Sequence, residues 1–581
     1  MIIAPYFAFI RDTDTRFSPR LSAVISEDLQ KQGLGILLKT PRMCFVACPS
    51  SRHLKPVGDT SLIWGSLFDR RSARFLVRLH DVELQAPAER FVTQFWGGYL
   101  ALREQANSVE IFRDPSGMIP AYVASVDGVS VVTSCPGTLV SLGLLSPSVD
   151  FTIVTQALAF RDLRPARTAL RGFSELHPGT AIEIGGEVSR VRQIWSPWTF
   201  TRPEVEISDR GQAVKAVRET VLQAATSWAG TCSRPIVELS GGLDSSIVTA
   251  SLAHAGAAPT CATFVPLPGD SDERHYARAV AEHHGLRIEE LEIDIGHVDV
   301  TASDSSALPW PCARSFAQAL DRPLQRLALS IGADMFYSGG GGDNVFCHLQ
   351  SSLPILDAIR RHGLGMQAVR TTMDVAEVAD ITFWEAARSA LGRRFEGDRL
   401  LPKARINRFL AKSALADLPW PAGNPWLEAE RQSLAGKRRH VWALLSILNH
   451  MEGFGRQAIG PICSPLLSQP VVETCLRIPT WLWFERGQNR SVARAAFRDL
   501  LPRAVVGRQS KAAFDSLGAS VIRSNIGVLR GMLLDGLLVR QGIADAVTIE
   551  TALARDMPDG EAVADLLALS DVEAWARAWK P

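Results

Sequence analysis

The strongest chemical signal in the sequence is the run Ser240-Gly241-Gly242-Leu243-Asp244-Ser245-Ser246. It follows a short apolar strand, expected over 236–239, and opens a helix that the sequence LDSSIVTASLAHAG predicts. Glycines in such a turn let backbone N–H groups face an anion, and the N-terminus of the helix adds partial positive charge. The serine hydroxyls can donate to phosphate oxygens, whereas Asp244 would repel a bare phosphate unless Mg²⁺ lay between them. The run therefore predicts a phosphate site that uses Mg²⁺, without the lysine of the common P-loop.

Alternating strands and helices surround this run and predict how it is held. A helix is expected over 213–230, strands over 260–267 and 287–294, and a helix over 272–285. Strand–helix–strand alternation of this length predicts βαβ units and a parallel sheet. Ligands of such sheets lie at the carboxyl ends of the strands, so we expect backbone there to meet adenine and ribose. The residues in question are Val237, Leu239, Thr263 and Phe264.

The first 200 residues have a different texture. Short apolar segments alternate with turns such as Gly-Gly, Asp-Pro-Ser-Gly and Pro-Gly, which is typical of a sheet-rich domain. The polar, proline-bearing stretch 196–212 is the best linker candidate. We therefore expect two domains, at 1–200 and 208–581, the second ending in a mostly helical part from about 310.

Composition excludes several classes of protein. The chain has 581 residues, 46% of them hydrophobic, and 62 Lys+Arg balance 61 Asp+Glu, which argues against a dedicated nucleic-acid binder. Nine scattered cysteines without a Cys-x-x-Cys pair indicate reduced thiols. No apolar run approaches the roughly 18 residues of a membrane span, and the start lacks a basic signal region. We expect a cytoplasmic protein without a membrane span.

The serine- and glycine-rich run resembles the Ser-Gly-Gly-x-Asp-Ser signature of the asparagine-synthetase-type ATP pyrophosphatases. Residues 272–277 resemble the family's Asp-Glu-x-x-Tyr-Ala helix start, and residues 337–344 resemble its second loop, Ser-Gly-x-Gly-x-Asp. Residues 508–514 resemble its Arg-x-x-Lys-x-x-Phe segment. Residues 112–122 and Pro178-Gly179 resemble its glutaminase-like domain. Residues 464–467 resemble its Pro-Leu-Leu-Asp segment, although Ser468 replaces the acid and the upstream Glu-x-Arg is missing.

The resemblance implies a fold and a set of site residues. The fold is α/β: an N-terminal glutaminase-like, Ntn-type α/β/β/α sandwich, then a doubly wound parallel-sheet ATP-pyrophosphatase domain with a helical C-terminal part. Asp244 and Asp343 would hold Mg²⁺, and Lys511 would stabilise the acyl-adenylate. A lysine directed at a developing oxyanion fits that role. The residues expected to meet ATP and pyrophosphate are Val237, Leu239, Ser240, Gly241, Gly242, Asp244, Ser245, Ser246, Thr263, Phe264, Gly339 and Gly341.

The N-terminal domain departs from the family where a glutaminase needs its nucleophile. A glutaminase of this kind uses a cysteine at residue 2, whose amine and thiol act together. Residue 2 here is isoleucine, and the nearest cysteines are Cys44 and Cys48. The family's Asn-Gly-Glu string appears as Trp64-Gly65-Ser66, without the carboxylate. We therefore expect no glutamine hydrolysis, while synthesis from free ammonia stays open.

Two branches of the family lack that cysteine and use an amine of their own substrate: β-lactam synthetase and the lasso-peptide macrolactam synthetases. β-Lactam synthetase carries a tyrosine at the position of Gly340, as part of a Tyr–Glu base pair. Here Gly340 has no side chain, and Asn344 replaces the acid after Asp343. A peptide α-amine, with a pKa of about 7.7–8.0, needs no strong base. This favours the lasso branch, although Glu452 or His450 could serve as a base.

The expected reaction is amide formation driven by ATP and Mg²⁺. A side-chain Asp or Glu of a precursor peptide would be adenylated, and the peptide's N-terminal amine would close a macrolactam. The partners implied are that core peptide, a leader-recognition protein and a leader peptidase. The four glycines 339–342 could also make room for a folded peptide. Three alternatives stay open: an ammonia-using asparagine synthetase, a β-lactam-type small-molecule cyclase, and a non-catalytic peptide-binding scaffold.

Overall fold

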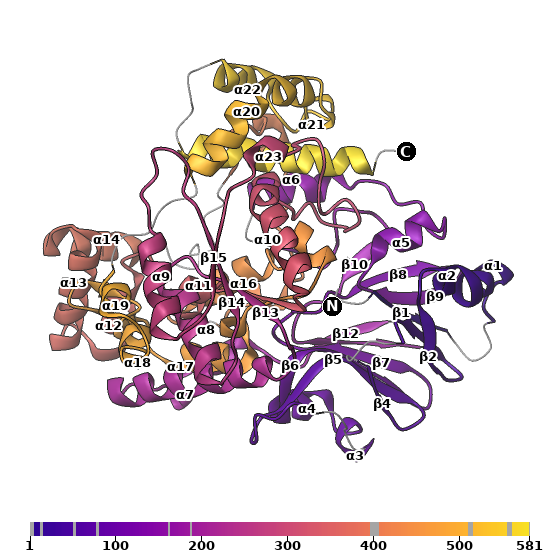
Figure 1. Cartoon of the computed structure of the whole chain (residues 1–581), viewed down its shortest axis with the longest axis horizontal. Coiled ribbons are helices and arrows are strands. Elements are labelled where there is room, and N and C mark those ends of the chain that lie inside the picture. Colours follow the sequence, from indigo (N-terminus) through magenta and orange to yellow (C-terminus); the bar gives the residue numbers. More distant parts are fainter. Residues whose placement is uncertain are drawn as a thin grey trace.

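A β-sandwich and a parallel sheet organise the chain, as the computed structural model shows (Figure 1). Two six-stranded sheets form the N-terminal sandwich, and a five-stranded sheet lies at the centre of the C-terminal part. The structure describes residues 5–11, 16–49, 54–76, 81–160, 163–185, 189–394, 406–430, 432–508, 515–554 and 560–579.

Every strand pair within the sandwich is antiparallel. One sheet has the order β10-β8-β9-β1-β3-β2, and the other has the order β12-β11-β7-β6-β5-β4. The strands are β1 (Tyr6–Ile10), β2 (Gly35–Lys39), β3 (Met43–Ala47), β4 (Leu54–Val57), β5 (Ser61–Asp69), β6 (Phe95–Glu104), β7 (Val109–Arg113), β8 (Tyr122–Val126), β9 (Val129–Thr133), β10 (Phe173–Glu175), β11 (Thr180–Ile184) and β12 (Arg190–Gln193).

Strand β1 shows why the sandwich has four layers. Its side chains alternate: Tyr6 and Ala8 join the core between the sheets, whereas Phe7 and Phe9 join a second core on the outer face. All five residues are therefore buried. Helices α1 (Pro19–Ala23), α2 (Leu29–Lys31), α5 (Pro136–Ser141) and α6 (Phe151–Ala159) contribute to that outer core, and α3 (Asp81–Leu84) and α4 (Ala88–Gln94) cover the other sheet. The layers run helix, sheet, sheet, helix, as the resemblance implies.

The stretch 196–212, expected to be a linker, is part of the packed structure. It contains two short 3-10 helices, Pro197–Thr201 and Pro203–Val205, and Trp198 is only 2% exposed. The Ile207 N–H donates to the carbonyl of Arg477 (2.9 Å). The linker interpretation is therefore wrong for this segment, because its tryptophan and isoleucine enter the core shared with the C-terminal part.

The C-terminal sheet is parallel throughout, with the order β15-β14-β13-β16-β17. Helices α7 (Arg210–Ala229) and α8 (Leu243–His254) pack on one face, where Val237 lies, and α10 (Gln318–Ile331) packs on the other, against Ile236. This confirms the doubly wound parallel sheet and its helical continuation. The strands are β13 (Pro235–Glu238), β14 (Thr260–Phe264), β15 (Ile288–Leu291), β16 (Met335–Tyr337) and β17 (Ile462–Cys463).

The remaining elements are almost all helical. A two-stranded hairpin, β18 (Phe484–Glu485) and β19 (Gln488–Asn489), interrupts them. The helices are α9 (Arg274–His283), α11 (Gly342–Val345), α12 (Leu353–His362), α13 (Met366–Ala379), α14 (Phe383–Arg394), α15 (Lys412–Ala416), α16 (Ala435–Leu448), α17 (Gln469–Arg477), α18 (Ser491–Ala496), α19 (Arg503–Val506), α20 (Asp515–Leu534), α21 (Leu537–Arg540), α22 (Ala546–Leu553) and α23 (Gly560–Ala578).

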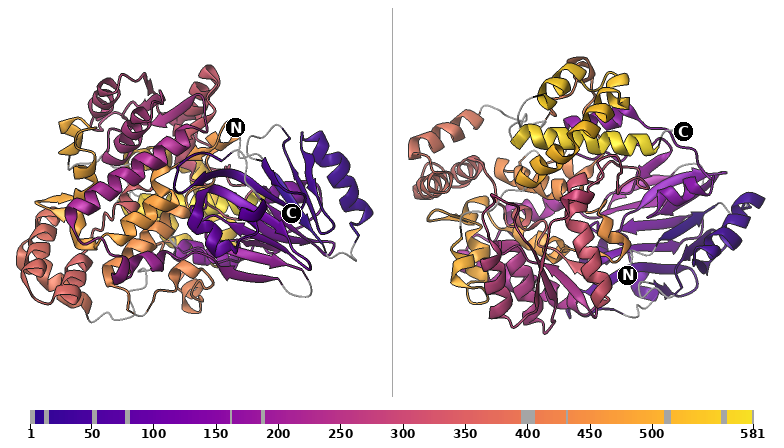
Figure 2. Two further views of the ribbon diagram at one scale, coloured as in Figure 1. Left: turned by 90° about the horizontal axis from the view of Figure 1, so that it is seen from below. Right: turned by 45° about the horizontal axis from the view of Figure 1, so that its top comes forward.

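Helices α20 to α23 pack beside α6, at the top of Figure 1 and toward the viewer in the right panel of Figure 2. Val521 of α20 and Trp575 of α23 belong to the same apolar core as Phe9 of β1 and Val154 of α6. The last elements of the chain therefore complete the outer core of the first sheet.

Two findings concern the whole described chain. Its nine cysteines are all free. Within the described ranges, no helix combines the length and the apolar character that crossing a bilayer requires.

Candidate active site

The two glycine-rich loops meet at the point where the strand order reverses. Strand β13 pairs with β14 on one side and with β16 on the other, so Val237 lies beside Tyr337. The first loop follows β13 and the second follows β16, and their carboxyl ends share one edge of the sheet. A crevice at such a switch point is where doubly wound sheets bind their ligands.

The first loop has the geometry of an anion site. Gly241 adopts φ +70°, a left-handed conformation that favours glycine, and Gly242 caps the twelve-residue helix α8. The hydroxyls of Ser240 and Ser245 lie 3.1 Å apart, and Ser245 also accepts from the Ser240 N–H (3.3 Å). Ser246 is fully buried, so its expected contact with phosphate stays a prediction. The other polar groups of the loop lie at the amino end of α8, where an anion is stabilised.

The second loop packs directly on the first. A Cβ added at Gly339 would lie 2.5 Å from the Ser245 nitrogen, and one added at Gly342 would overlap the Asp244 side chain. Gly341 has φ +86° and touches Leu467. At Gly340 an added Cβ would make one tight contact, with the Oγ of Ser338 at 3.3 Å, and a flexible serine side chain can move aside. Three of the four glycines therefore serve close packing, and the idea that they widen a substrate pocket applies to Gly340 alone.

Asp244 and Asp343 converge on one cationic atom. Nη1 of Arg490 lies 3.1 and 2.9 Å from the two carboxylate oxygens of Asp244, and it also contacts Asp343 Oδ1. Because both carboxylates contact the same nitrogen atom, they lie close enough to bind one small cation together. These residues therefore fit Mg²⁺. Among the residues that the structure describes, no group of three His, Cys, Asp or Glu could hold a metal without further ligands. Phosphate oxygens and water would have to complete the coordination.

Sequence reasoning missed Arg490, which closes a ring of polar contacts. Its Nε donates to the side chain of Asn489 (3.2 Å), whose amide lies 3.2 Å from His348 Nε2. His348 Nδ1 lies 3.4 Å from Asp343. Arg490 has φ +51°, a strained value for a residue with a side chain, and is 8% exposed. Such strain often marks functional positions. No local sequence pattern marks Arg490, whose left-handed conformation beside the hairpin β18–β19 is visible only in the structure.

The ends of β13 and β14 lie together, where adenine and ribose were expected. The Leu239 N–H donates to the carbonyl of Ala262 (2.8 Å), and Glu238 is in register with Ala262. The side chains of Val237 and Leu239 are buried, so only their backbone could meet a nucleoside. Thr263 is 4% exposed and Phe264 is partly exposed at the adjacent edge. Their contact with nucleotide stays a prediction.

Lys511 lies outside the described residues, which stop at Arg508 and resume at 515. Arg508 itself is well placed, because its Nη1 donates to the carbonyl of Gly241 in the first loop (3.1 Å). The expected role of Lys511 therefore stays a prediction.

Asn344 and the candidate base Glu452 are engaged in structural contacts. The Asn344 amide donates to the carbonyl of Ala443 in α16 (2.6 Å). Glu452 accepts a hydrogen bond from the Tyr122 hydroxyl of the sandwich, and burial raises the pKa of its carboxyl against the opposing effect of Arg164. His450 follows α16 and is partly buried. Glu452 thus joins the two halves of the protein, which speaks against its use as a base.

Trp64 and Gly65, which stand where the resembled family has its Asn-Gly-Glu string, are core residues of the sandwich. Trp64 is 1% exposed and packs on Phe45, with ring centroids 5.5 Å apart. A Cβ at Gly65 would overlap the Gly98 carbonyl of the next strand. Asp114 is fully buried, accepts from the Tyr99 N–H (3.0 Å), and has its pKa raised to about 6 by that burial. Ile2 lies outside the described residues.

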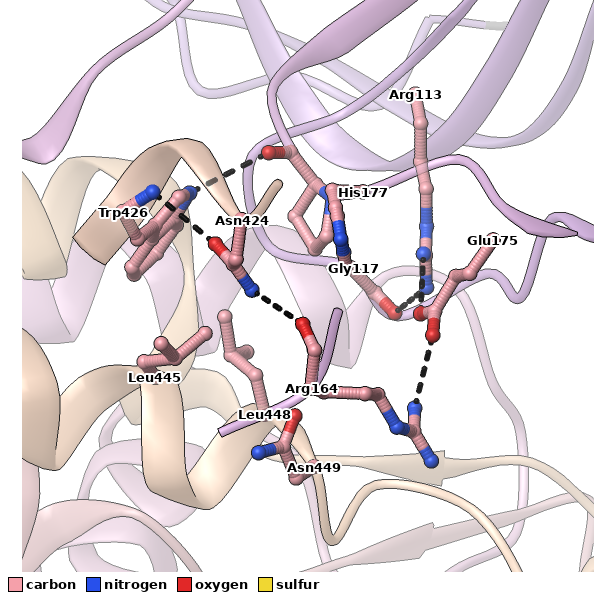
Figure 3. Close-up of a pocket in the computed structure, with 11 residues that line it drawn as sticks. Arg113, Gly117, Arg164, Glu175, His177, Asn424, Trp426, Leu445, Leu448 and Asn449 are labelled. Atoms are coloured by element: carbon pink, nitrogen blue, oxygen red, sulfur yellow. Dashed lines mark hydrogen bonds and ion pairs between the residues drawn. The ribbon is translucent and has the colours of Figure 1, made fainter. Parts of the chain in front are cut away.

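A small cavity lies between the sandwich and the C-terminal part (Figure 3). The Glu175 carboxylate joins Arg113 (3.1 Å) and Arg164 (3.4 Å) on its sandwich side, and burial lowers the pKa of His177 there to about 4. Trp426 and four other residues of 424–449 line the opposite side. None of the lining residues comes from the two loops, so this cavity is separate from the candidate active site.

Comparisons with known proteins agree with these loops. The family model "Asparagine synthase" matches residues 217–449 and 462–577, more than half of the chain. Carboxyethyl-arginine beta-lactam-synthase from Streptomyces clavuligerus is 29% identical over 277 residues, which are 44% of this chain and 51% of that protein. The chain thus spans about half the length of this curated relative.

Two solved structures show a likeness too weak to carry an argument, each with a TM-score of 0.20. One is glutamine phosphoribosylpyrophosphate amidotransferase from B. subtilis complexed with ADP and GMP, with 10% identity, covering 58% of this chain and 75% of that one. The other is described as the allosteric regulatory enzyme of purine biosynthesis, with 9% identity and coverage of 51% and 76%.

Proposed function

This chain belongs to the asparagine synthase family, and we propose that it is an ATP-dependent ligase that closes an amide ring within a precursor peptide. The observation that carries the proposal is the convergence of both loops, with Asp244 and Asp343, on one cationic atom at the switch point of the sheet. That arrangement suits the triphosphate of ATP.

The reaction has two steps. A carboxylate oxygen of an Asp or Glu side chain attacks the α-phosphorus of ATP, the bond to pyrophosphate breaks, and an acyl-adenylate forms. The N-terminal amine of the same peptide then attacks the acyl carbon and loses a proton, and AMP leaves. The first loop binds the departing pyrophosphate through Gly242, Ser240 and Ser245 at the amino end of α8. Reaction within one molecule gains its rate mainly from proximity, so the enzyme must hold the peptide folded.

Three residues act on the negative charge of the pyrophosphate and the acyl-adenylate. Asp244 and Asp343 would hold Mg²⁺, which neutralises charge on pyrophosphate when bound. Arg490 neutralises the same two carboxylates in the nucleotide-free protein and would compete with Mg²⁺ for them. Lys511, by resemblance, stabilises the charge that develops on the adenylate.

The peptide substrate is supported by the missing base. Gly340 offers no side chain, and the amide of Asn344 is committed to the Ala443 carbonyl. A peptide α-amine is partly neutral near pH 7.7–8.0, about its ordinary pKa, and so does not require a strong base. We propose that a leader-recognition protein and a leader peptidase prepare the core peptide in the cytoplasm.

A second candidate is a small-molecule cyclase. It is favoured by the 29% identity to a beta-lactam-synthase. An ammonia-using ligase remains the third candidate, since the sandwich offers a buried core where a glutaminase would bind its substrate.

Mass spectrometry of products formed with ATP and Mg²⁺ separates the candidates. Leader-free core peptides, a carboxyethyl-arginine, and aspartate with ammonium would be supplied separately, and AMP would be followed in each. A peptide that loses one water with matching AMP supports the proposal. AMP with a β-lactam or with asparagine would replace it by the second or third candidate.

Variants of the site test the assignment of residues. Asp244→Asn and Lys511→Ala should each abolish AMP formation. Asp380→Asn is the matched control, because Asp380 is exposed at the end of α13 with φ +52°, a conformation that asparagine tolerates. Full turnover by either site variant would contradict the assignment.

A further inference from the structure

Arg508 is the meeting point of three segments that are far apart in the sequence. Its Nη1 donates to the carbonyl of Gly241 in the first loop (3.1 Å), and its Nη2 forms an ion pair with Glu273. Its guanidinium also lies over the ring of Tyr276, 4.4 Å from the centroid. The Arg508 side chain is only 5% exposed. One buried cation thus joins the loop to the start of helix α9.

The partners of Arg508 on α9 also fix the turn of the loop. A Cβ at Gly241 would lie 2.5 Å from Cβ of Tyr276 and 2.8 Å from the backbone nitrogen of Ala277. Gly241 therefore rests against α9, and its φ of +70° suits no other residue well. Tyr276 packs against Gly241 of the loop, and Arg508 donates a hydrogen bond to the Gly241 carbonyl.

Holding the Gly241 carbonyl fixes an amide that faces the ligand. The carbonyl of Gly241 and the N–H of Gly242 belong to one planar, trans peptide unit and point in opposite directions. Once Arg508 fixes the carbonyl, the Gly242 N–H is directed to the other side of the loop, where it donates a long hydrogen bond to Ser240 Oγ (3.3 Å) that a phosphate oxygen would replace or share. Gly242 is the N-cap of α8, where we place the phosphate.

The backbone of Arg508 reaches the second half of the site. Its carbonyl accepts from Arg494 Nη2 (2.8 Å), and Arg494 Nε donates to the carbonyl of Asn489 (2.9 Å), the residue before Arg490. Burial, and then the nearby charge of Arg490, lower the pKa of Arg494 to about 10. Arg508 and Arg494 therefore link the first loop to the residue that bridges Asp244 and Asp343.

We infer that Arg508 is a positioning residue for ATP, held in place by Glu273 and Tyr276, and that it directs the phosphate-binding amide of the first loop. Glu273 and Tyr276, at the start of α9, would then position Arg508 and would not contact the substrate. The inference rests on the proposed ATP site, but it does not depend on which acid or amine the enzyme uses.

The test measures binding of a non-hydrolysable ATP analogue, α,β-methylene-ATP with Mg²⁺, by calorimetry on the full chain. Arg508→Ala should weaken binding about ten- to hundredfold, because a hydrogen bond from a charged group is lost at the loop. Arg508→Lys should fall between this variant and the wild type, since lysine keeps the charge but not the planar fork. Arg274→Ala is the matched control: Arg274 is the next residue after Glu273 but pairs with Asp272 (2.7 Å) and Glu290 (2.5 Å).

A second variant guards against misfolding. Arg508→Ala leaves Glu273 without this cation, so the double variant Arg508→Met/Glu273→Gln removes both charges together. We expect it to melt near the wild-type temperature and still bind the analogue at least tenfold more weakly. Wild-type affinity in a folded Arg508 variant would overturn the inference alone. A wild type that does not bind the analogue would overturn the proposed function and this inference with it.

Discussion

The contact of Arg490 with both aspartates predicts how the nucleotide-free protein binds a divalent cation. Nη1 lies 2.9 Å from Asp244 Oδ2 and closer still to Asp343 Oδ1, so the two oxygens are less than twice 2.9 Å apart. At about 5.8 Å two unit charges repel by about 3 kcal/mol at an effective dielectric constant of 20, and by about 0.7 kcal/mol in water. The Asp343 side chain is 34% exposed, so solvent screening puts the effect at about 1–2 kcal/mol.

Replacing Arg490 with methionine leaves these two charges facing each other without their cation. We expect the variant, without nucleotide, to bind Mn²⁺ about five- to thirtyfold more tightly than the wild type, because about 1.4 kcal/mol corresponds to a factor of ten. Free Mn²⁺ would be followed by electron paramagnetic resonance during a titration. Without a divalent cation the variant should also melt at a lower temperature than with Mn²⁺.

A matched control removes the same charge elsewhere. Arg202 pairs with Glu430 (2.5 Å) at an exposed position, and Arg202→Met should leave Mn²⁺ binding unchanged. If Arg490→Met bound Mn²⁺ no more tightly than this control, the arginine would not compete for the cation position, and the fit of Asp244 and Asp343 to Mg²⁺ would lose its support.

Two further predictions follow from packing and burial. Gly339→Ala should lower the melting temperature and abolish ATP analogue binding, because its Cβ would overlap the backbone of α8. Gly340→Ala should have a smaller effect on both, because its Cβ would make one tight contact, with the movable Oγ of Ser338 at 3.3 Å. Equal losses of affinity and of melting temperature in the two variants would contradict the packing argument. Burial, and then the charge of Lys437, lower the pKa of His440 to about 3. Below about pH 6.5 His440 binds a proton in the unfolded chain but not in the folded protein. His440 therefore lowers the stability of the folded protein as the pH decreases below about 6.5. Between pH 7.5 and 5 the melting temperature of His440→Gln should therefore decrease less than that of the wild type. His275→Gln is the control and should behave like the wild type. If the melting temperature of His440→Gln decreased with pH as much as that of the wild type, the argument would be refuted.

The parallel sheet and its first loop could be predicted from the sequence because their signals are local. The run 240–246 carries its own turn, cap and strand, and β13 and α8 lie within one residue or two of the expected bounds. The meeting of Asp244 and Asp343 was expected from the resemblance of their two loops, and it agrees with a general property of parallel sheets, whose carboxyl ends share one edge. Here local pattern and global fold agree.

Arg490 and Trp198 show where such reasoning ends. Arg490 meets Asp244 across 246 residues of sequence, and no periodicity or motif marks that contact. The stretch around Trp198 is polar and rich in proline, as linkers are, yet one buried tryptophan decides its packing. In each case a contact between residues far apart in the sequence, which no short stretch of sequence reveals, determined the structure.

The outer core of the first sheet ties the stability of the two ends of the chain together. Because Phe9 and Val154 from the start of the chain share one apolar cluster with Val521 and Trp575 from its end, each half supplies a surface that the other must cover. Removing the first 200 residues would expose apolar side chains of the helices α20 to α23 to water. Those residues are therefore a scaffold for the end of the chain, whichever reaction the protein carries out.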